Sequence, residues 1–356
     1  MPISIMLKPS SSACNLRCDY CFYADVAEHR SVDNKGMMTE ETAERVIESA
    51  LDYCNDRIFF TFQGGEPLLR GIEFFYRFTA TAKKLNTNGT KIHYALQTNG
   101  TLLNDEWCRL FRDNGFLVGV SLDGDEELND YRRFADGTPS YPAVMQGIEL
   151  LKKHNVPFNI LSVLTKRTAN NFRRSYRFFK ANGLEHLQYI PCLKPFGEAD
   201  NRYSMSVDDY SDYLQSSFRV YYNDILRGKT VSIRQLDNYC LLAQGGNAEQ
   251  CGMNGTCSNQ FVVEGDGSVY PCDFYCTDRW YLGNINDGDF SLMGSSSTAA
   301  QFIKESFVMP DQCKDCKHLF LCRAGGCKRN RESYNYCKAY KQFFDANTDN
   351  LKKLAR

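Results

Sequence analysis

The sequence lacks any long apolar run and any strong excess of charge. No stretch approaches the ~20 apolar residues that span a membrane, and residues 1–8 lack the basic start and apolar core of a signal peptide. With 42 Lys and Arg against 43 Asp and Glu, the formal net charge is −1, which gives no reason to expect nucleic acid or an anionic membrane as a partner. We therefore expect a cytoplasmic protein that binds neither.

Histidine is scarce, whereas cysteine is abundant and unevenly placed. The chain has 5 His and 16 Cys; three of the cysteines lie in the first 21 residues and nine lie between Cys251 and Cys337. A reducing compartment does not maintain disulfides, and a chain of 356 residues does not need them for stability. The two groups of cysteines therefore indicate metal binding near both ends of the chain.

Cys14, Cys18 and Cys21 have the spacing Cys-x3-Cys-x2-Cys. Three thiolates on one short loop can hold three corners of a [4Fe–4S] cluster, and the fourth iron is then open to bind and activate a small molecule. A zinc knuckle or a disulfide loop is the alternative. Zinc needs a fourth ligand nearby, and the closest histidine, His29, lies beyond an acidic run, so we favour the cluster.

The first two thirds of the chain alternate between β-type and helical patterns. Strands are expected at residues 3–7, 58–62, 92–96, 117–121, 158–163 and 187–190, and helices at 39–54, 73–85, 105–114, 141–153 and 171–182. Six such repeats predict an α/β fold in which a partial TIM-type (β/α)6 barrel carries its functional loops at the carboxyl ends of the strands. Residues 205–228 should form an amphipathic helix, and the polar residues 227–246 a bridge to a second domain.

Small and polar motifs follow three of these strands, as the barrel rule requires. They are Gln63-Gly-Gly-Glu-Pro67, Gln97-Thr-Asn-Gly100 and Ser121-Leu-Asp-Gly124. Each alone is a common turn or strand end. In this order behind the three cysteines, they indicate one functional face.

The second group of cysteines could supply two complete four-thiolate sites. Eight of its nine members would be ligands, and a pair of structural zinc ions is the alternative to clusters. The ninth, Cys276, could replace one of the ligands or contact a substrate. The eight are Cys251, Cys257, Cys272, Cys313, Cys316, Cys322, Cys327 and Cys337.

These motifs resemble the radical S-adenosylmethionine (SAM) superfamily with its C-terminal SPASM extension. The resemblance implies a radical SAM core at residues 1–225, a SPASM domain with two auxiliary [4Fe–4S] clusters at 226–340 and a closing helix at 341–356. It implies three clusters in all, the first of which binds SAM. Auxiliary cluster I would be held by Cys251, Cys257, Cys272 and Cys327, and auxiliary cluster II by Cys313, Cys316, Cys322 and Cys337.

The same resemblance implies contacts to SAM. Tyr20 is the aromatic residue before the last cysteine of the loop, and the backbone of Gly65 would meet the amino group of SAM. Ser121 and Arg133 would contact its ribose and carboxylate, although the sequence does not tell whether Arg132 or Arg133 points inward. Leu193 would pack on its adenine.

Two further stretches resemble the anaerobic sulfatase-maturating enzymes, and the resemblance to this family covers nearly the whole chain. They are Leu7-Lys-Pro-Ser-Ser11 and Tyr270-Pro-Cys-Asp-Phe-Tyr275. The resemblance implies oxidation of Cys or Ser in a Cys/Ser-x-Pro/Ala-x-Arg motif of an unfolded sulfatase to Cα-formylglycine, with Asp273 as the general base. Gln63 and Tyr23 would contact the peptide. A flavodoxin- or ferredoxin-type protein would donate low-potential electrons.

Two alternative functions remain open. A radical SAM and SPASM maturase of ribosomally made peptides, which forms thioether or carbon–carbon crosslinks or epimerises residues, would share every cluster. A zinc-stabilised binding module would have no catalytic activity, and it would be colourless.

Overall fold

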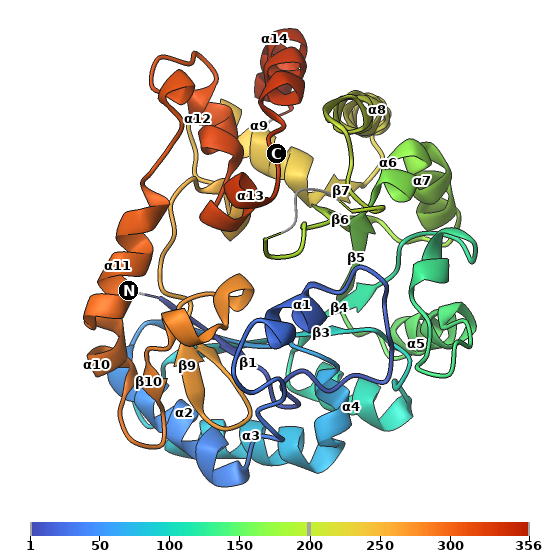
Figure 1. The fold of residues 1–356 in the computed structure, drawn as a ribbon. Coiled ribbons are helices and arrows are strands. Elements are labelled where there is room, and N and C mark those ends of the chain that lie inside the picture. The colour runs from blue at the N-terminus through green and yellow to red at the C-terminus, as the bar shows by residue number, and fades with distance from the viewer. Residues whose placement is uncertain (1, 198–200, 355–356) are drawn as a thin grey trace. The chain divides into compact units, whose positions relative to one another are not determined.

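A computed structural model describes residues 2–197 and 201–354 (Figure 1). The chain forms two compact units. The first unit comprises Met1–Ser121, Asp130–Phe158 and Ser258–Phe302, and the second comprises Leu122–Asn129, Asn159–Cys257 and Ile303–Arg356. Within the described ranges, no helix is both long enough and apolar enough to cross a membrane.

The first unit is built on parallel strands that begin with the N-terminus. The strands lie in the order β10-β9-β8-β1-β2-β3-β4. β1 pairs in parallel with both β2 and β8, while β8, β9 and β10 form an antiparallel meander. The bounds are β1 Ile3–Leu7, β2 Arg57–Phe62, β3 Lys91–Thr98, β4 Leu117–Ser121, β8 Val262–Val263, β9 Ser268–Tyr270 and β10 Gly283–Asn284.

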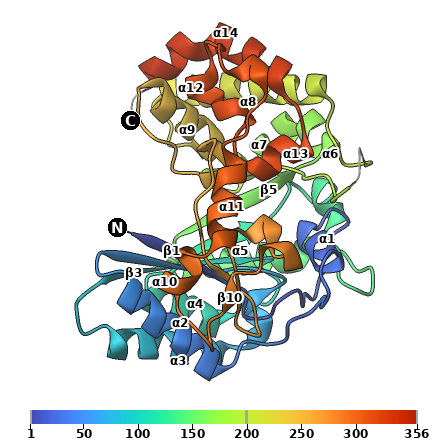
Figure 2. The same ribbon diagram turned by 60° about the vertical axis from the view of Figure 1, so that its left-hand side comes forward.

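Helices α2, α3 and α4 lie in a row along one face of these strands (Figures 1 and 2). Helix α2 begins where the Thr39 hydroxyl accepts a hydrogen bond from the Thr42 amide, and it buries Val46, Ile47 and Ala50 at helical spacing. The helices of this unit are α1 Phe22–Glu28, α2 Glu40–Tyr53, α3 Ile72–Leu85, α4 Asp105–Asp113, α5 Tyr141–Lys153 and α10 Phe290–Gly294; α11 Ser297–Ser306 runs into the second unit.

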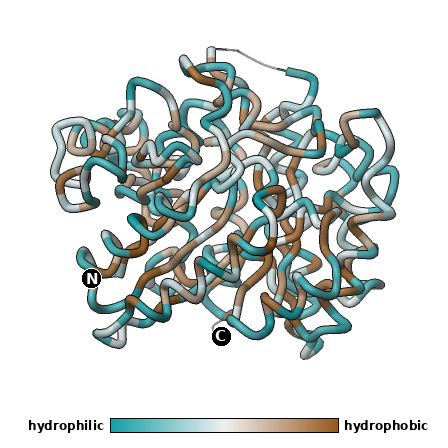
Figure 3. The backbone as a smooth tube through the Cα atoms, turned by 90° about the horizontal axis from the view of Figure 1, so that it is seen from below, coloured by the Kyte–Doolittle hydropathy of each residue, from teal (hydrophilic) through white to brown (hydrophobic). Residues whose placement is uncertain are grey.

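An aromatic core fills the space between these helices and the strands. In β2 the side chains of Ile58, Phe60 and Phe62 are buried, whereas the alternate positions on the opposite face of the sheet are exposed or half-buried. The Phe62 ring lies 5.0 Å from the ring of Phe78 on α3. Along the backbone, hydrophobic and hydrophilic segments alternate over short distances (Figure 3), as expected when helices and strands each bury one face.

The second unit combines short parallel strands with the remaining helices. β6 pairs with both β5 and β7, and α14 packs against α8 and α9 (Figure 2). The elements are β5 Phe158–Leu164, β6 His186–Pro191, β7 Ser232–Ile233, α6 Lys166–Asn170, α7 Phe172–Ala181, α8 Val207–Leu226, α9 Arg234–Ala243, α12 Leu319–Cys322, α13 Lys328–Ser333 and α14 Cys337–Lys353.

The strands and helices predicted for the first two thirds of the chain are all present, within a few residues of their expected bounds. The prediction of a polar bridge at residues 227–246 is wrong. This stretch contains helix α9, which buries Leu236, Tyr239 and Leu242. Its apolar residues have helical spacing, but its polar composition concealed them.

A closing helix is present, as expected. Helix α14 runs from Cys337 to Lys353, and residues 355–356 of the predicted closing segment lie outside the described ranges.

Candidate functional site

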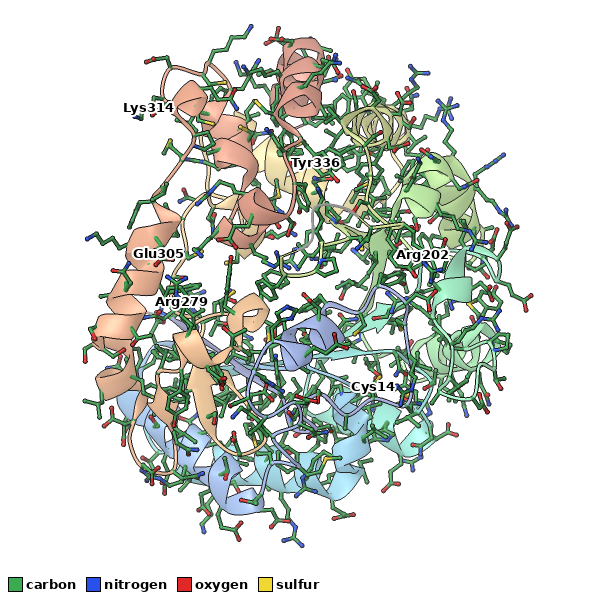
Figure 4. All side chains as sticks on the ribbon, viewed as in Figure 1. Cys14, Arg202, Arg279, Glu305, Lys314 and Tyr336 are labelled. Atoms are coloured by element: carbon green, nitrogen blue, oxygen red, sulfur yellow. The ribbon has the colours of Figure 1, made fainter. Side chains whose placement is uncertain are left out.

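The cysteine loop follows β1 directly and ends at helix α1. The Cys21 amide donates a hydrogen bond to the carbonyl of Cys18 at 3.2 Å, and Cys21 is the residue that caps α1. Cys14 is exposed, whereas Cys18 and Cys21 are half-buried. Figure 4 labels Cys14 in the loop that leads into this helix. The short loop thus brings the three predicted ligands together.

The sulfur atoms in this loop receive hydrogen-bond donors, as cluster sulfurs commonly do. The Leu16 amide lies 3.4 Å from Cys14 Sγ and Asn99 Nδ2 lies 3.9 Å from it. Although part of the Cys14 residue is exposed, the protein atoms packed around its thiol desolvate it and raise its pKa to about 11, and the nearby Glu66 and Cys21 also act to raise it. Ligation would therefore have to release this proton. These residues fit three thiolate corners of a cluster.

Gly65 packs directly against the cysteine loop. Its amide donates to the Ser11 carbonyl at 2.9 Å, and a Cβ at this position would lie only 2.0 Å from the carbonyl oxygen of Ala13. Only glycine permits this approach. Because the amide is already used, the carbonyl is the backbone group of Gly65 that could meet the amino group of a ligand.

Glu66 links the cysteine loop to the end of β3 through hydrogen bonds. Its buried carboxyl group accepts hydrogen bonds from the Leu68 amide, the Thr98 hydroxyl and the Asn99 amide. Burial raises the pKa of Glu66 to about 7, although these hydrogen bonds oppose the shift. Glu66 therefore supports the site through buried hydrogen bonds, a role that the sequence motif did not indicate.

Arg132 and Arg133 differ in where their side chains lie. Arg133 binds Asp130 and the carbonyl of Gly137, at the surface of its own loop. Arg132 is buried, with Nη1 4.0 Å from Cys18 Sγ and the guanidinium 5.3 Å from the centre of the Tyr20 ring. The structure thus places the side chain of Arg132 beside Cys18, whereas Arg133 meets the same loop through its carbonyl, which accepts from the Arg17 amide at 2.8 Å.

The other predicted cofactor contacts lie on both units. Tyr20 packs edge-on against Tyr131, with 6.1 Å between the ring centres. The Ser121 hydroxyl at the end of β4 accepts a hydrogen bond from Gln97 at 3.0 Å. Leu193 follows β6 in the second unit and is half-buried, unlike the fully buried leucines of the core. Each contact to SAM remains a prediction.

Asp273 lies at the centre of a buried polar group in the first unit. The Tyr23 hydroxyl donates to Oδ2 at 2.7 Å and also interacts with Gln63, while Lys8 Nζ lies 3.0 Å from Oδ1. Burial raises the pKa of Tyr23 well above its ordinary value, and the Asp273 carboxylate raises it further. Tyr23 therefore remains a hydrogen-bond donor to Asp273, beside the helix that follows the cysteine loop.

Three charged residues around Asp273 were missed by sequence analysis. Lys8, Arg30 and Glu264 are all buried. Arg30 Nη1 lies 2.6 Å from Glu264 Oε1, and Lys8 Nζ lies 3.4 Å from the same oxygen. A lysine directly after an apolar strand was the one available signal for Lys8.

Seven of the predicted auxiliary ligands lie in the second unit, in two groups. Electrostatic interactions link Cys251 and Cys327 with Cys257. A second set links Cys313, Cys316, Cys322 and Cys337. Burial raises the pKa of the Cys251 thiol to about 12, and the neighbouring thiols add to the shift.

Backbone amides point at sulfurs in both groups. Cys322 accepts from Gly325 and Ala324, and Cys327 accepts from Asn330 and Arg329. The residues therefore fit clusters whose sulfurs are hydrogen-bonded. Cys272, the eighth predicted ligand, belongs to the first unit.

In the ranges 2–197 and 201–354, no three His, Cys, Asp or Glu side chains converge in the way that a single metal ion requires.

Two family models match the chain. That of the radical SAM superfamily matches residues 9–179, and that of SPASM, an iron-sulfur cluster-binding domain, matches residues 251–317. The first match includes Cys14, Cys18 and Cys21, and the second includes Cys251, Cys257, Cys272, Cys313 and Cys316.

The chain is similar to curated proteins over nearly its whole length. A cysteine-type anaerobic sulfatase-maturating enzyme of Clostridium perfringens (strain 13 / Type A) is 42% identical, over 97% of this chain and 96% of its own length. A serine-type enzyme of Bacteroides thetaiotaomicron is 34% identical, over 96% and 89%. A solved structure of native anSMEcpe with bound AdoMet and Cp18Cys peptide is 40% identical, with a TM-score of 0.93 and 99% coverage of both chains. The predicted α/β fold is thereby confirmed.

Proposed function

Because this chain belongs to the anaerobic sulfatase-maturating enzymes of the radical SAM superfamily, we propose that it oxidises a cysteine side chain of an unfolded sulfatase to Cα-formylglycine without oxygen. The target motif is Cys-x-Pro-x-Arg, as the family resemblance implies. The family assignment made from the sequence motifs is confirmed by the extent of the similarity.

One geometric observation carries the proposal. Asp273 is held at 2.7 Å by Tyr23, which lies two residues after Cys21, the last cysteine of the first loop. A general base must first lie within reach of the proton that it removes. Here the carboxylate and the cysteine loop belong to one unit, and Tyr23 ties them together.

The cofactors are SAM and three [4Fe–4S] clusters. Cys14, Cys18 and Cys21 would hold the first cluster and leave one iron for SAM, and the eight later cysteines would hold the other two. When bound, these groups supply a carbon radical that removes a hydrogen atom from the β-carbon of the target, and an acceptor for one further electron.

Asp273 takes the proton that the target thiol must lose. The side chain loses one hydrogen atom from its β-carbon, one electron and the thiol proton, and a C=S bond forms. Water then adds to this bond, sulfide leaves, and the aldehyde remains. Tyr23 donates a hydrogen bond to Oδ2 and thereby holds the carboxylate in place.

The similarity favours cysteine over serine as the target. The cysteine-type relative is 42% identical, compared with 34% for the serine-type relative. A thiol also loses its proton more readily than a hydroxyl group, which suits a carboxylate base. A peptide with serine at the target position distinguishes the two.

The electron donor is a small acidic protein of the flavodoxin or ferredoxin type. Residues 303–356 contain 12 Lys and Arg but only 6 Asp and Glu, although the whole chain is almost neutral. Lys317 and Lys314 are 76% and 64% exposed near Cys313 and Cys316 (Figure 4 labels Lys314). Such a basic surface attracts an acidic partner electrostatically.

Mass spectrometry of a synthetic peptide tests the function. Reconstituted enzyme is incubated anaerobically with SAM, dithionite and a peptide that contains Cys-x-Pro-x-Arg, beside an Asp273→Asn variant. We expect an aldehyde product that decreases about 100-fold or more in the variant. If the wild-type protein cleaves SAM but leaves the peptide unmodified, the assignment moves to peptide crosslinking or epimerisation.

A further inference from the structure

Lys8 is a buried, positively charged residue in direct contact with the proposed base. Its side chain is 2% exposed and directly follows β1. Nζ lies 3.0 Å from Asp273 Oδ1, 3.4 Å from Glu264 Oε1 and 3.3 Å from Cys276 Sγ. It also lies 4.8 Å from the centre of the Tyr23 ring. The ammonium group thus touches the base, its hydrogen-bond donor and a buried thiol.

A buried ammonium group is costly unless nearby groups compensate its charge. Burial lowers the pKa of Lys8, but the Asp273 carboxylate and the other acidic neighbours outweigh this effect and raise the pKa above its ordinary value. Burial raises the pKa of the Cys276 thiol to about 12, so Cys276 accepts a hydrogen bond from Lys8 as a neutral thiol. Lys8 is therefore a permanent positive charge.

Glu264 has partners of its own besides Lys8. Arg30 Nη1 binds its Oε1 at 2.6 Å, and the Ser11 hydroxyl donates to its Oε2 at 2.7 Å. The group holds two positive charges, Lys8 and Arg30, against two carboxylates, Glu264 and Asp273. Because Arg30 already forms an ion pair with Glu264, the positive charge of Lys8 can compensate the charge of Asp273.

The two oxygens of Asp273 are held differently. Oδ2 accepts a hydrogen bond from Tyr23 at 2.7 Å, whereas Oδ1 is buried and pairs with the Lys8 ammonium group at 3.0 Å. The two contacts come from different segments of the chain, β1 with its following residue and helix α1. Together they fix the orientation of the carboxylate.

We propose that Lys8 is a positioning residue for the oxidation: its ion pair with Oδ1, together with the Tyr23 hydrogen bond to Oδ2, fixes the orientation of the Asp273 carboxylate. This inference rests on the proposed function. With the cofactors bound, the thiol proton would pass to the Asp273 carboxylate, the β-carbon would lose one hydrogen atom and one electron to the cofactors, and C=S would form.

Glu264 explains how Lys8 tolerates this step. When Asp273 takes the proton, it becomes neutral and its attraction for Lys8 weakens. Glu264 Oε1 remains 3.4 Å from the ammonium group and keeps it paired. Proton transfer therefore does not leave an isolated buried charge.

The test compares Lys8→Met with Lys8→Arg and with a control, Lys35→Met. Methionine keeps much of the chain length without the charge, and arginine keeps the charge. Lys35 pairs with Asp266 at 3.1 Å in the same β8–β9 region. The readout is the ratio of aldehyde formed to SAM cleaved, measured together with the peptide KM, the iron content and the rate of SAM cleavage.

We expect Lys8→Met to lower this ratio about tenfold or more, while iron content, peptide KM and SAM cleavage stay near their wild-type values. Lys8→Arg should recover part of the ratio, and Lys35→Met should leave it unchanged. A wild-type ratio in Lys8→Met overturns the proposal. So does a loss of iron or SAM cleavage in parallel with the ratio, because that result assigns Lys8 a purely structural role.

Failure of the proposed function would look different. In that case the wild-type enzyme itself makes no aldehyde although it cleaves SAM. The Lys8 variants are then compared by the same ratio for the oxidised product that the wild type does make. A drop again supports positioning of Asp273, and an unchanged ratio overturns it.

Discussion

The hydroxyl group of Tyr23 donates a hydrogen bond to Asp273 Oδ2 at 2.7 Å, although 250 positions separate the two residues in the chain. Tyr23 lies in the first turn of α1, and Asp273 begins a single 3-10 turn after Cys272. The contact fixes the proposed base relative to the helix that follows the cysteine loop. Proton transfer and radical formation are therefore positioned by the same short segment.

Replacing Tyr23 by phenylalanine tests this contact. The variant loses one hydrogen bond to Asp273 but keeps the ring against Phe22, whose centre is 4.0 Å away. We expect the rate of aldehyde formation to fall about fivefold, equivalent to about 1 kcal/mol. Tyr53→Phe on the exposed surface of α2 is the control. Unchanged turnover in Tyr23→Phe would show that the hydrogen bond does not matter for the reaction.

Gly65→Ala should disturb the first cluster site selectively. The new methyl group would lie 2.0 Å from the Ala13 carbonyl oxygen, so the cysteine loop would have to move. We expect a loss of about four of the roughly twelve irons per chain, together with SAM cleavage. Gly288→Ala, where the nearest side-chain atom is 3.6 Å away, should keep all of its iron. Full iron content in Gly65→Ala would contradict the close packing.

Cysteine substitutions test the proposed ligands of the second unit. Cys337 is the first residue of helix α14, and it interacts electrostatically with Cys313. We expect Cys337→Ala to lose about four irons per chain, as measured by iron analysis and visible absorption. Cys276→Ala should lose none, since Cys276 Sγ contacts Lys8. The reverse pattern would make Cys276 a ligand in its place.

Asp224 provides a stability test away from the cofactors. Tyr176 donates to its carboxylate at 2.7 Å, and Lys180 binds the same oxygen. Burial opposes ionisation, but these partners hold the pKa of Asp224 below its ordinary value. Asp224→Asn should lower the free energy of unfolding by about 1–3 kcal/mol, compared with Asp212→Asn at an exposed position of the same helix.

The pH dependence of this difference follows from the direction of the shift. A lowered pKa in the folded state stabilises the fold above the unfolded pKa, and the contribution disappears as the pH falls through the folded pKa. Urea unfolding should therefore give a constant difference between wild type and Asp224→Asn from pH 8 to 5. The difference should shrink only below about pH 4. A difference in the free energy of unfolding that increases as the pH falls would contradict the prediction.

Reversing surface charge should affect the electron donor but not the chemistry. We expect Lys314→Glu with Lys317→Glu to slow turnover about tenfold with an acidic flavodoxin, most clearly at low salt. Turnover with dithionite should be unchanged. The matched control is Lys83→Glu with Lys84→Glu on α3, also exposed. Equal slowing in both pairs would place the contact elsewhere.

The fold and the cysteine sites could be predicted largely because their signals are local. Each strand and helix of the first two thirds has its own apolar period, and the spacing of Cys14, Cys18 and Cys21 is a property of eight consecutive residues. Helix α9 was not predicted, because polar residues surround its buried Leu236 and Leu242 in the sequence. The division at residues 225 and 340 remains a prediction.

The support of the proposed base could not be predicted, because its contacts join distant parts of the chain. Lys8, Arg30 and Glu264 are ordinary charged residues in the sequence, and only folding brings them to Asp273. The choice between Arg132 and Arg133 likewise depends on a loop geometry that adjacent identical residues cannot reveal.

The pairing of β1 with β8 has a consequence for the order of events during synthesis. Leu7 in the first strand aligns with Val263, so the ribosome must make more than two thirds of the chain before this strand gains its second neighbour. Long-range pairing of this kind is slow and leaves a strand edge exposed in the meantime. The first cysteine loop follows that strand directly, and Lys8 cannot meet Asp273 earlier. Iron loading and completion of the reaction centre are therefore expected after translation, on a nearly finished chain.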